Sequence, residues 1–436
     1  MVKPHITGIL FEKSLNRVNK ILRVTGTQLK DEDSDRTLVQ RLRHRFSYCF
    51  NVFWHNSDLI CEIAWFFNGA MTGKSLTELT YALPCITLCL LANMKGYYCI
   101  KYAHHLNEIV RTLRELETRQ IQTGTDRKEI TDELLQKRFP YLNRATNLLT
   151  FINVFVIFFF ALSPLMLTAL NYYREGELNL LLPFLMLYPF DAFNIKIWPF
   201  VFLHQIWSGI IAVFSVFGPD CFYYTCCTFI HINFRSIQYD MERIIGPTYN
   251  GMVQQKDIEF QTKFVDLVKR HKALLRCVDL LEIIYSKSAL FNAFTSSTLI
   301  CLTGFNVTVN NNLLVIGPFI IFLFLSLFQI YLFCYYGDTI MRSSMGLSDS
   351  VYKSQWYNAD PSVGKDLIFV LTRAQKPCKL TAYGFADINL RAFTRVRVIV
   401  CFETWFSNEF LKFLGLHYYY YFTVELKMLF ICKRNK

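Results

Sequence analysis

Two acidic residues lie within an otherwise apolar stretch near the start of the chain, FWHNSDLICEIAWFFNGA. Asp58 and Glu62 are four residues apart, so a helix carries both carboxyl groups on one face. Ionisable groups inside a membrane pair with a neighbouring helix, face water or act directly in function. We favour a structural partner or a water-filled face over a direct role, and the pair marks a candidate polar site.

The other reactive side chains form no pattern that supports catalysis or metal binding. His104 and His105 are adjacent, so their rings point about 100° apart on a helix. Many of the fourteen cysteines lie in apolar runs without zinc-type CxxC spacing, and the candidate outside loops contain none. No nucleophile–base constellation or Gly-rich phosphate loop occurs. We therefore predict no enzyme, no metal site, no cofactor and no disulfide framework.

The composition is that of a membrane protein. Of 436 residues, 53% are hydrophobic, 16% are aromatic and only 18% are charged, so the apolar segments exceed what a soluble core absorbs. The net charge of +12 could suggest nucleic acid. However, the basic residues are mixed with acids in loops beside apolar segments, which indicates a positive-inside bias and no nucleic-acid partner.

One stretch is long enough for a transmembrane hairpin. The fifty residues Ser288–Gly337 contain no Asp, Glu, Lys or Arg, and a bilayer core of about 30 Å needs roughly 20 apolar residues as helix. Residues 310–312 are three successive Asn, which predict a turn outside the hydrocarbon. Asn306 begins the sequon Asn-Val-Thr, so its glycosylation would place this tip outside the cell.

The apolar segments predict an all-α, polytopic membrane protein with seven transmembrane helices. The expected spans are 46–70, 76–100, 145–173, 198–222, 284–308, 313–336 and one within 396–431. The amino-terminal segment and the long loops carry 35 Lys or Arg, whereas the short loops carry 3, so the amino terminus is expected to be intracellular. This orientation opposes that of G-protein-coupled receptors, and Asp-Arg-Tyr and NPxxY motifs are absent.

These spans suggest four regions. They are a cytoplasmic segment 1–45; spans one to six in 46–340, with charged helical cytoplasmic loops 101–144 and 235–282; a cytoplasmic anchor segment 341–395; and the seventh span with the carboxyl-terminal tail in 396–436.

Two further segments have a specific expected role. The opening segment has Phe11, Leu15, Val18 and Leu22 at helical spacing among basic residues. It predicts an amphipathic helix that either lies on the membrane surface or packs as a short cytosolic helix. The aromatic loop LPFLMLYPFDAFNIKIWP is expected to fold over the membrane face as a lid.

Four stretches carry a resemblance to the insect odorant receptor family. They are Gly73–Tyr81 (GKSLTELTY), Leu182–Asn194 (LPFLMLYPFDAFN), Ser350–Tyr357 (SVYKSQWY) and, most specifically, Arg373–Val396 (RAQKPCKLTAYGFADINLRAFTRV). The opening HITGILFEKSLNRVNKILRVTG, together with GKSLTELTY, resembles the moth pheromone-receptor branch more than the family at large.

The resemblance implies an odorant or pheromone receptor in sensory transduction. Such a chain is the ligand-binding subunit of an odorant-gated cation channel, a hetero-tetramer with the olfactory co-receptor in the plasma membrane of an olfactory sensory neuron dendrite. Its other partners are a small volatile hydrophobic odorant or pheromone and the lipid bilayer. The alternatives are a seven-helix G-protein-coupled receptor and a non-conducting splice variant of an odorant receptor.

The ligand site implied by this resemblance lies in the outer halves of the helices. A pocket for an apolar chain with one polar end is expected to be mostly aromatic with a few hydroxyls. The candidate ligand-binding residues, chosen for their common depth, are Tyr81, Leu83, Phe159, Phe160, Ser163, His204, Trp207, Thr303 and Phe319.

The tail departs from the family pattern after Val396. Arg397, Glu403, Glu409 and Lys412 occur where a pore-lining span should be uncharged, and each charge costs about 2.5–3.5 kcal/mol at a helix centre. The alternative span 413–431 is also interrupted, and it ends in a basic cluster that conflicts with an outside carboxyl terminus. The expectation is an intact sensing part with a compromised pore.

Overall fold

The computed structural model describes residues 6–29, 38–122, 125–176, 178–245, 257–309 and 313–395. Within these ranges the protein is helical, with a single isolated β-bridge between Thr381 and Asp387. The helices are α1 (Ile6–Thr25), α2 (Leu38–Met71), α3 (Leu76–Lys101), α4 (Ala103–Gln122), α5 (Thr125–Glu175), α6 (Trp198–Glu242), α7 (Ile258–Val309), α8 (Leu313–Lys353), the short 3-10 helix η1 (Trp356–Asn358) and α9 (Pro361–Ala374).

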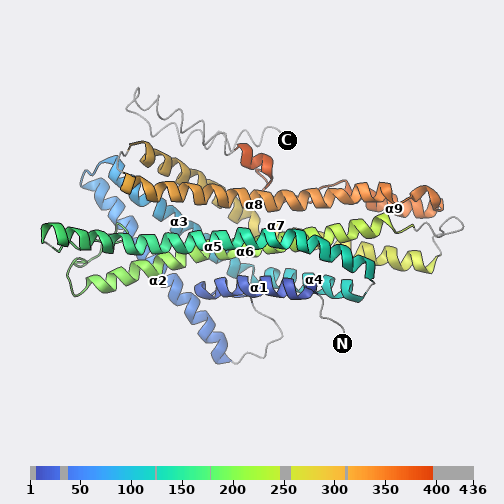
Figure 1. The fold of residues 1–436 in the computed structure, drawn as a ribbon, viewed down its shortest axis with the longest axis horizontal. Helices are drawn as coiled ribbons and strands as arrows, with labels where there is room; N and C mark the ends of the chain where they lie inside the picture. The colour runs from blue at the N-terminus through green and yellow to red at the C-terminus, as the bar shows by residue number, and fades with distance from the viewer. Residues whose placement is uncertain are drawn as a thin grey trace, which may run out of the picture.

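Four long helices set the shape of the molecule. Helices α5, α6, α7 and α8 contain 51, 45, 52 and 41 residues and run roughly along the longest axis (Figure 1). At about 1.5 Å per residue, each is longer than the hydrocarbon core of a bilayer. Helices α2 and α3 lie toward one end of the long axis, beside the uncharged runs of α5 and α8, and this end is called the apolar half. Helices α4 and α9 lie toward the other end, which is called the polar half (Figure 1).

The expected all-α, multi-pass fold is confirmed. Four helical segments in the described part of the chain are long and apolar enough to cross a membrane, namely Glu78–Lys101, Gln136–Glu175, Trp198–Glu242 and Ile320–Lys353. The segments expected as spans one and five lie within α2 and α7. The turn at 310–312 and the proposed seventh span and tail in 396–436 lie outside the described residues.

The charged segments between the spans are largely helical. Only residues 103–122 form a helix of their own, α4. The remaining charged segments continue the long helices without a break: α5 starts at Thr125, α6 continues to Glu242, and α7 starts at Ile258. Pro140 and Pro219 lie near these boundaries but inside α5 and α6, so neither proline ends its helix.

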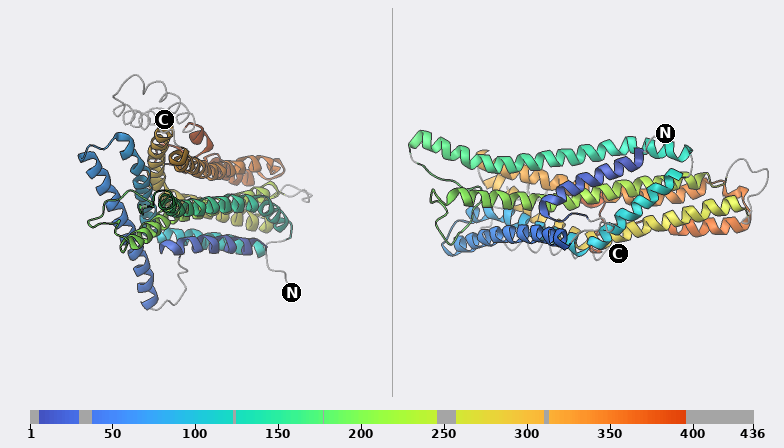
Figure 2. Two further views of the ribbon diagram at one scale, coloured as in Figure 1. Left: turned by 60° about the vertical axis from the view of Figure 1, so that its left-hand side comes forward. Right: turned by 90° about the horizontal axis from the view of Figure 1, so that it is seen from below.

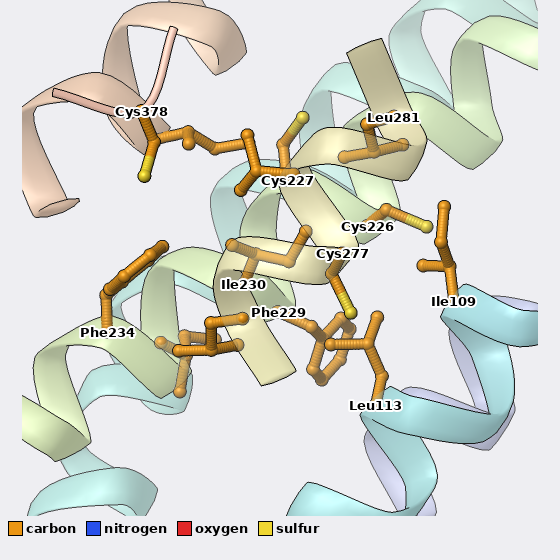
Figure 3. Packing of buried hydrophobic residues seen from close by; sticks show 14 of the residues in the cluster. Ile109, Leu113, Cys226, Cys227, Phe229, Ile230, Phe234, Cys277, Leu281 and Cys378 are labelled. Atoms are coloured by element: carbon orange, nitrogen blue, oxygen red, sulfur yellow. The ribbon is translucent and has the colours of Figure 1, made fainter. Parts of the chain in front are cut away.

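Helix α6 is the centre of the bundle and contacts α1, α2, α3, α5, α7 and α8 (Figure 2). Tyr223 and Tyr224 are fully buried and stack on α8, with ring centroids 4.2 Å from Phe333 and 4.9 Å from Tyr336. In the polar half, residues of α4, α6 and α7 interdigitate around Cys226, Cys227 and Cys277 (Figure 3). This packing makes α6 the common neighbour of α1, α2, α3, α5, α7 and α8.

Helix α1 is a packing helix, which decides between the two interpretations of the opening segment. Its apolar residues Phe11, Leu15, Val18 and Leu22 are each at most 3% exposed. Phe11 meets Phe229 of α6 edge-on, with ring centroids 4.8 Å apart. The apolar face is therefore covered by protein and is not available to a membrane surface.

Docking of α1 is expected to depend on pH through Glu117 of α4. Burial, with a smaller contribution from the nearby Glu12, raises the pKa of this carboxyl to about 7. The folded protein holds the Glu117 proton more tightly than the unfolded chain does. The protonated carboxyl group therefore adds to the free energy of unfolding at low pH, and this contribution is lost as the pH rises from about 4.5 to about 7. We expect thermal unfolding of the purified chain to occur at higher temperature at pH 6 than at pH 8, and Glu117→Gln to reduce this difference.

The matched control for this prediction is Glu115→Gln on the same helix. Glu115 is exposed and pairs only loosely with Arg111, at 3.9 Å. This variant removes the same charge from a solvated position, so it should leave the pH dependence unchanged. Equal effects of the two substitutions would contradict the assignment to Glu117.

Candidate functional site

A cavity of about 50 Å³ lies inside the apolar half, between α2, α3, α5, α6, α8 and the loop before α6. Three aromatic rings from separate elements form much of its wall. Phe160 of α5 stacks on Phe184 of the loop and also meets Phe322 of α8, with ring centroids 5.5 Å apart in both pairs. The result is a small, mainly apolar space between these helices.

Gln205 of α6 holds the loop over this cavity. Its side chain is fully buried, accepts a hydrogen bond from the Phe184 backbone N–H at 3.0 Å, and donates to the Phe184 carbonyl at 3.4 Å. Farther along the loop, the Leu187 N–H donates to the Cys61 carbonyl of α2 at 3.0 Å. These bonds hold the Phe184 ring in the wall of the cavity, and the role of the loop as a lid stays a prediction.

The polar part of the wall comes from α2. Asp58 and Glu62 both line the cavity and are each only 2% exposed. The four-residue spacing places them one turn apart on the same face, as the helical pattern predicts. Two buried carboxyl groups thus face a space whose remaining lining is almost entirely apolar.

A hydrogen-bonded network surrounds these carboxyl groups. His204 of α6 pairs with the Ser57 hydroxyl through Nε2 at 3.0 Å and with the Tyr188 hydroxyl through Nδ1 at 3.3 Å. Its Nδ1 lies 3.5 Å from Asp58 Oδ1, beyond an ordinary hydrogen bond. One turn earlier on α2, His55 bonds to the Ser208 hydroxyl and the Cys89 carbonyl. The network fixes α2 against α3 and α6.

A separate buried ion pair joins three other spans. Lys95 Nζ of α3 donates to both carboxylate oxygens of Asp220 of α6, at 2.7 and 2.8 Å. Gln329 of α8 donates to Asp220 Oδ2 at 2.5 Å. The Lys95 and Asp220 side chains are 3% and 2% exposed, so the charges are compensated entirely by protein.

The structure brings a few of the nine predicted site residues to the cavity. Phe160 lines it directly, and Phe159 contacts the Phe160 ring edge-on at 6.2 Å. His204 lies behind the carboxyl groups in the network described above. Their roles as ligand contacts remain predictions, and Phe160 has the most direct geometric support.

The other predicted residues lie away from the cavity lining. Thr303 is fully buried, and its hydroxyl bonds to carbonyls of its own helix, Leu299 and Ile300. Trp207 is 38% exposed on α6. Tyr81, Leu83 and Ser163 are partly buried on α3 and α5; Phe319 and the sequon residue Asn306 belong to α8 and α7, but their side chains lie outside the described part of the chain.

Choosing candidate ligand-binding residues by their depth along the helices missed some residues that line the cavity. Phe184 lies in the predicted lid, which was a usable signal, whereas nothing in the Phe-rich sequence around Phe322 distinguishes it from its neighbours. Asp58 and Glu62 were singled out by their spacing but omitted from the ligand-site set. In the described residues, no cluster of three or more His, Cys, Asp or Glu side chains could hold a metal ion.

Comparison with known proteins agrees with this arrangement. The family model described as 7tm Odorant receptor matches residues 75–398. The chain is similar to odorant receptor 67c of Drosophila melanogaster, with 25% identity over 344 residues that cover 78% of this chain and 82% of the relative. Odorant receptor 85b of the same species is 30% identical over 216 residues, which cover 49% and 53% of the two chains.

A solved structure shows the same fold. The insect olfactory receptor OR5 from Machilis hrabei, in complex with eugenol, is similar with a TM-score of 0.77 and 16% sequence identity. The similarity covers 91% of this chain and 98% of that one. Because the family model also spans most of the sequence, this chain belongs to the seven-transmembrane odorant receptor family, which comprises membrane receptors and not enzymes.

Proposed function

We propose that the chain is the odorant-binding subunit of an odorant-gated cation channel and acts together with the olfactory co-receptor. The observation that carries this proposal is the mainly apolar cavity walled by Phe160, Phe184 and Phe322. Its apolar surface and small polar patch match a volatile molecule with one polar group. The related Machilis receptor, whose structure contains eugenol, supports a ligand of similar size.

Exposed apolar residues in the polar half support assembly with another subunit. Tyr352, Tyr357 and Phe369, from α8, the η1 region and α9, are 76%, 63% and 76% exposed. Large apolar side chains outside the membrane-spanning segments are costly to leave in water and mark protein contacts. We assign this surface to the contact with the co-receptor in a hetero-tetramer, and the polar half to the cytoplasm.

The narrower assignment is a pheromone receptor of the moth branch, located in the dendrite of an olfactory sensory neuron. It is supported by the opening segment and by GKSLTELTY, which together cover the first part of the chain. A panel of fatty-chain aldehydes, alcohols and acetates tests it directly. A response restricted to short plant-type volatiles would contradict the pheromone assignment while leaving the receptor assignment intact.

Odorant-evoked current is expected only when this chain is expressed with the co-receptor. Voltage-clamp recording should show no current from this chain alone and a ligand-dependent cation current from the pair. Phe160→Ala should raise the half-maximal ligand concentration on the order of tenfold, because an aromatic wall of the cavity is lost.

The matched control is Phe158→Ala, two residues away on α5. Phe158 is 60% exposed on the outside of the bundle, so its removal should leave ligand potency unchanged. Surface labelling would verify equal amounts of each variant in the membrane. A robust odorant current from this chain alone, or equal effects of the two substitutions, would refute the proposal.

A further inference from the structure

The two carboxyl groups of the cavity have incomplete hydrogen bonding. Asp58 contacts the Ser208 hydroxyl, and Glu62 contacts the Cys89 thiol. One oxygen of each group, Asp58 Oδ1 and Glu62 Oε2, is buried and has no hydrogen-bond partner. A buried polar atom without a partner is costly, so two such carboxyl groups in the lining of one cavity indicate a donor that is supplied from outside the chain.

No basic side chain of the described residues is in place to satisfy them. The nearest candidate is His204, whose two ring nitrogens already pair with the hydroxyls of Ser57 and Tyr188. Asp220 shows the contrast, because this buried carboxylate receives two bonds from Lys95 and one from Gln329. The carboxyl groups of Asp58 and Glu62, which line the cavity, therefore differ from that of Asp220 in having an oxygen without a hydrogen-bond partner.

We propose that this receptor selects ligands that carry a hydroxyl group, with the hydroxyl at Asp58 and Glu62 and the apolar body against Phe160, Phe184 and Phe322. This deepens the proposed function, since it takes the same cavity as the ligand site. A hydroxyl donates to an ionised carboxylate, and it both donates to and accepts from a protonated carboxyl group. An aldehyde or an ester only accepts, so it leaves at least one carboxyl oxygen unpaired.

The lining favours a neutral donor over a charged one. An ammonium group can also donate to the carboxyl oxygens, but it must lose its hydration to enter a cavity with apolar walls. A hydroxyl meets the same acceptors without that cost. The cavity holds about three water molecules by volume, so a longer ligand must displace the aromatic side chains that surround it.

A matched six-carbon series tests this inference on the full chain. Hexan-1-ol, hexanal, hexyl acetate and hexylamine are compared by ligand-induced thermal stabilisation of the detergent-solubilised protein, and by current when the chain is expressed with the co-receptor. We expect hexan-1-ol to act at about tenfold lower concentration than each of the others, since a missing donor leaves buried acceptors unpaired.

Two substitutions at Glu62 separate hydrogen bonding from packing. Glu62→Met has a similar volume and no acceptor, so the advantage of hexan-1-ol over hexyl acetate should fall severalfold. Glu62→Gln keeps a carbonyl acceptor and should retain most of the advantage. Because Met removes an unpaired buried atom, the variant should unfold at the same or a higher temperature in the absence of ligand, which shows that the fold is kept.

Several results would overturn the inference. These are stabilisation by none of the four compounds, equal potency across the series, preference for hexanal, hexyl acetate or hexylamine, or an alcohol preference that is undiminished in Glu62→Met. Current without alcohol selectivity would reject this inference and leave the proposed function standing. Alcohol-selective stabilisation without current would support the ligand assignment and reject the channel function.

Discussion

Replacing Asp220 with Ala is expected to lower the free energy of unfolding by about 3–5 kcal/mol, because Lys95 would be left as an unpaired buried charge. Lys95 is 3% exposed, and Asp220 accepts both of its bonds. Gln329 would lose its acceptor at the same time. Thermal or denaturant unfolding of the purified chain in detergent measures the loss, and the amount of protein at the cell surface should fall in parallel.

Two further variants test the cause of this loss. The double substitution Lys95→Met with Asp220→Leu removes both charges and keeps similar volume, so it should recover most of the stability. Glu108→Ala breaks the pair between Glu108 and Arg276, in which the arginine is 55% exposed, and should cost at most about 1 kcal/mol. If the double variant were as unstable as Asp220→Ala, an unpaired charge could not be the reason.

Gly337→Ala is expected to destabilise the chain by about 1–3 kcal/mol through overpacking. A Cβ at this position of α8 would clash with the backbone carbonyl of Ile388 and lie 3.1 Å from the Tyr223 hydroxyl. A backbone carbonyl cannot rotate away as a flexible side chain can. We therefore expect the segment that contains Ile388 to shift away from α8, which limited proteolysis and thermal unfolding would detect.

The neighbouring contacts explain why this shift would matter. The Cys378 N–H donates to the Ser344 hydroxyl of α8 at 3.0 Å, and the Thr381 N–H donates to Glu282 Oε2 of α7 at 2.7 Å. The segment thus joins the polar ends of α7 and α8. Odorant-evoked current in the presence of the co-receptor should decrease with the loss of this docking.

The matched control for Gly337 is Gly96→Ala in α3. Nothing lies within 4 Å of a Cβ built on Gly96. Alanine favours a helix, so this variant should be neutral or more stable by about 0.4–1 kcal/mol. Equal destabilisation by both substitutions would show that close approach at Gly337 is not the cause.

Local patterns in the sequence determined the helices and several of their faces. Uncharged runs longer than a bilayer is thick require helices, because backbone groups cannot remain unpaired in hydrocarbon. The four-residue spacing of Asp58 and Glu62 placed them on one face, and the spacing of Phe11, Leu15 and Val18 identified the buried face of α1. These results follow from the helical repeat alone.

Contacts between residues that are far apart in the sequence could be identified only from the tertiary structure. Lys95 and Asp220 are separated by 125 residues, and each lies in an apolar stretch with no local sign of its partner. Likewise, α1 could cover either a membrane surface or a protein surface, because both bury the same apolar face. The choice depended on whether α6 offered a complementary face, and it did, through Phe229.

The cavity shows most clearly which features follow from the helical repeat and which depend on how the helices pack. A residue's depth along a helix follows from counting at about 1.5 Å per residue, and this counting selected candidates such as Phe160 and Trp207. Its direction around the axis changes by about 100° per residue, so it depends on how the helix is rotated against its neighbours. That rotation turns Phe160 toward the cavity and leaves Trp207 partly exposed. Counting along the chain therefore gives the depth of each residue, whereas the packing of α2, α3, α5, α6 and α8 sets which side chains meet in the cavity.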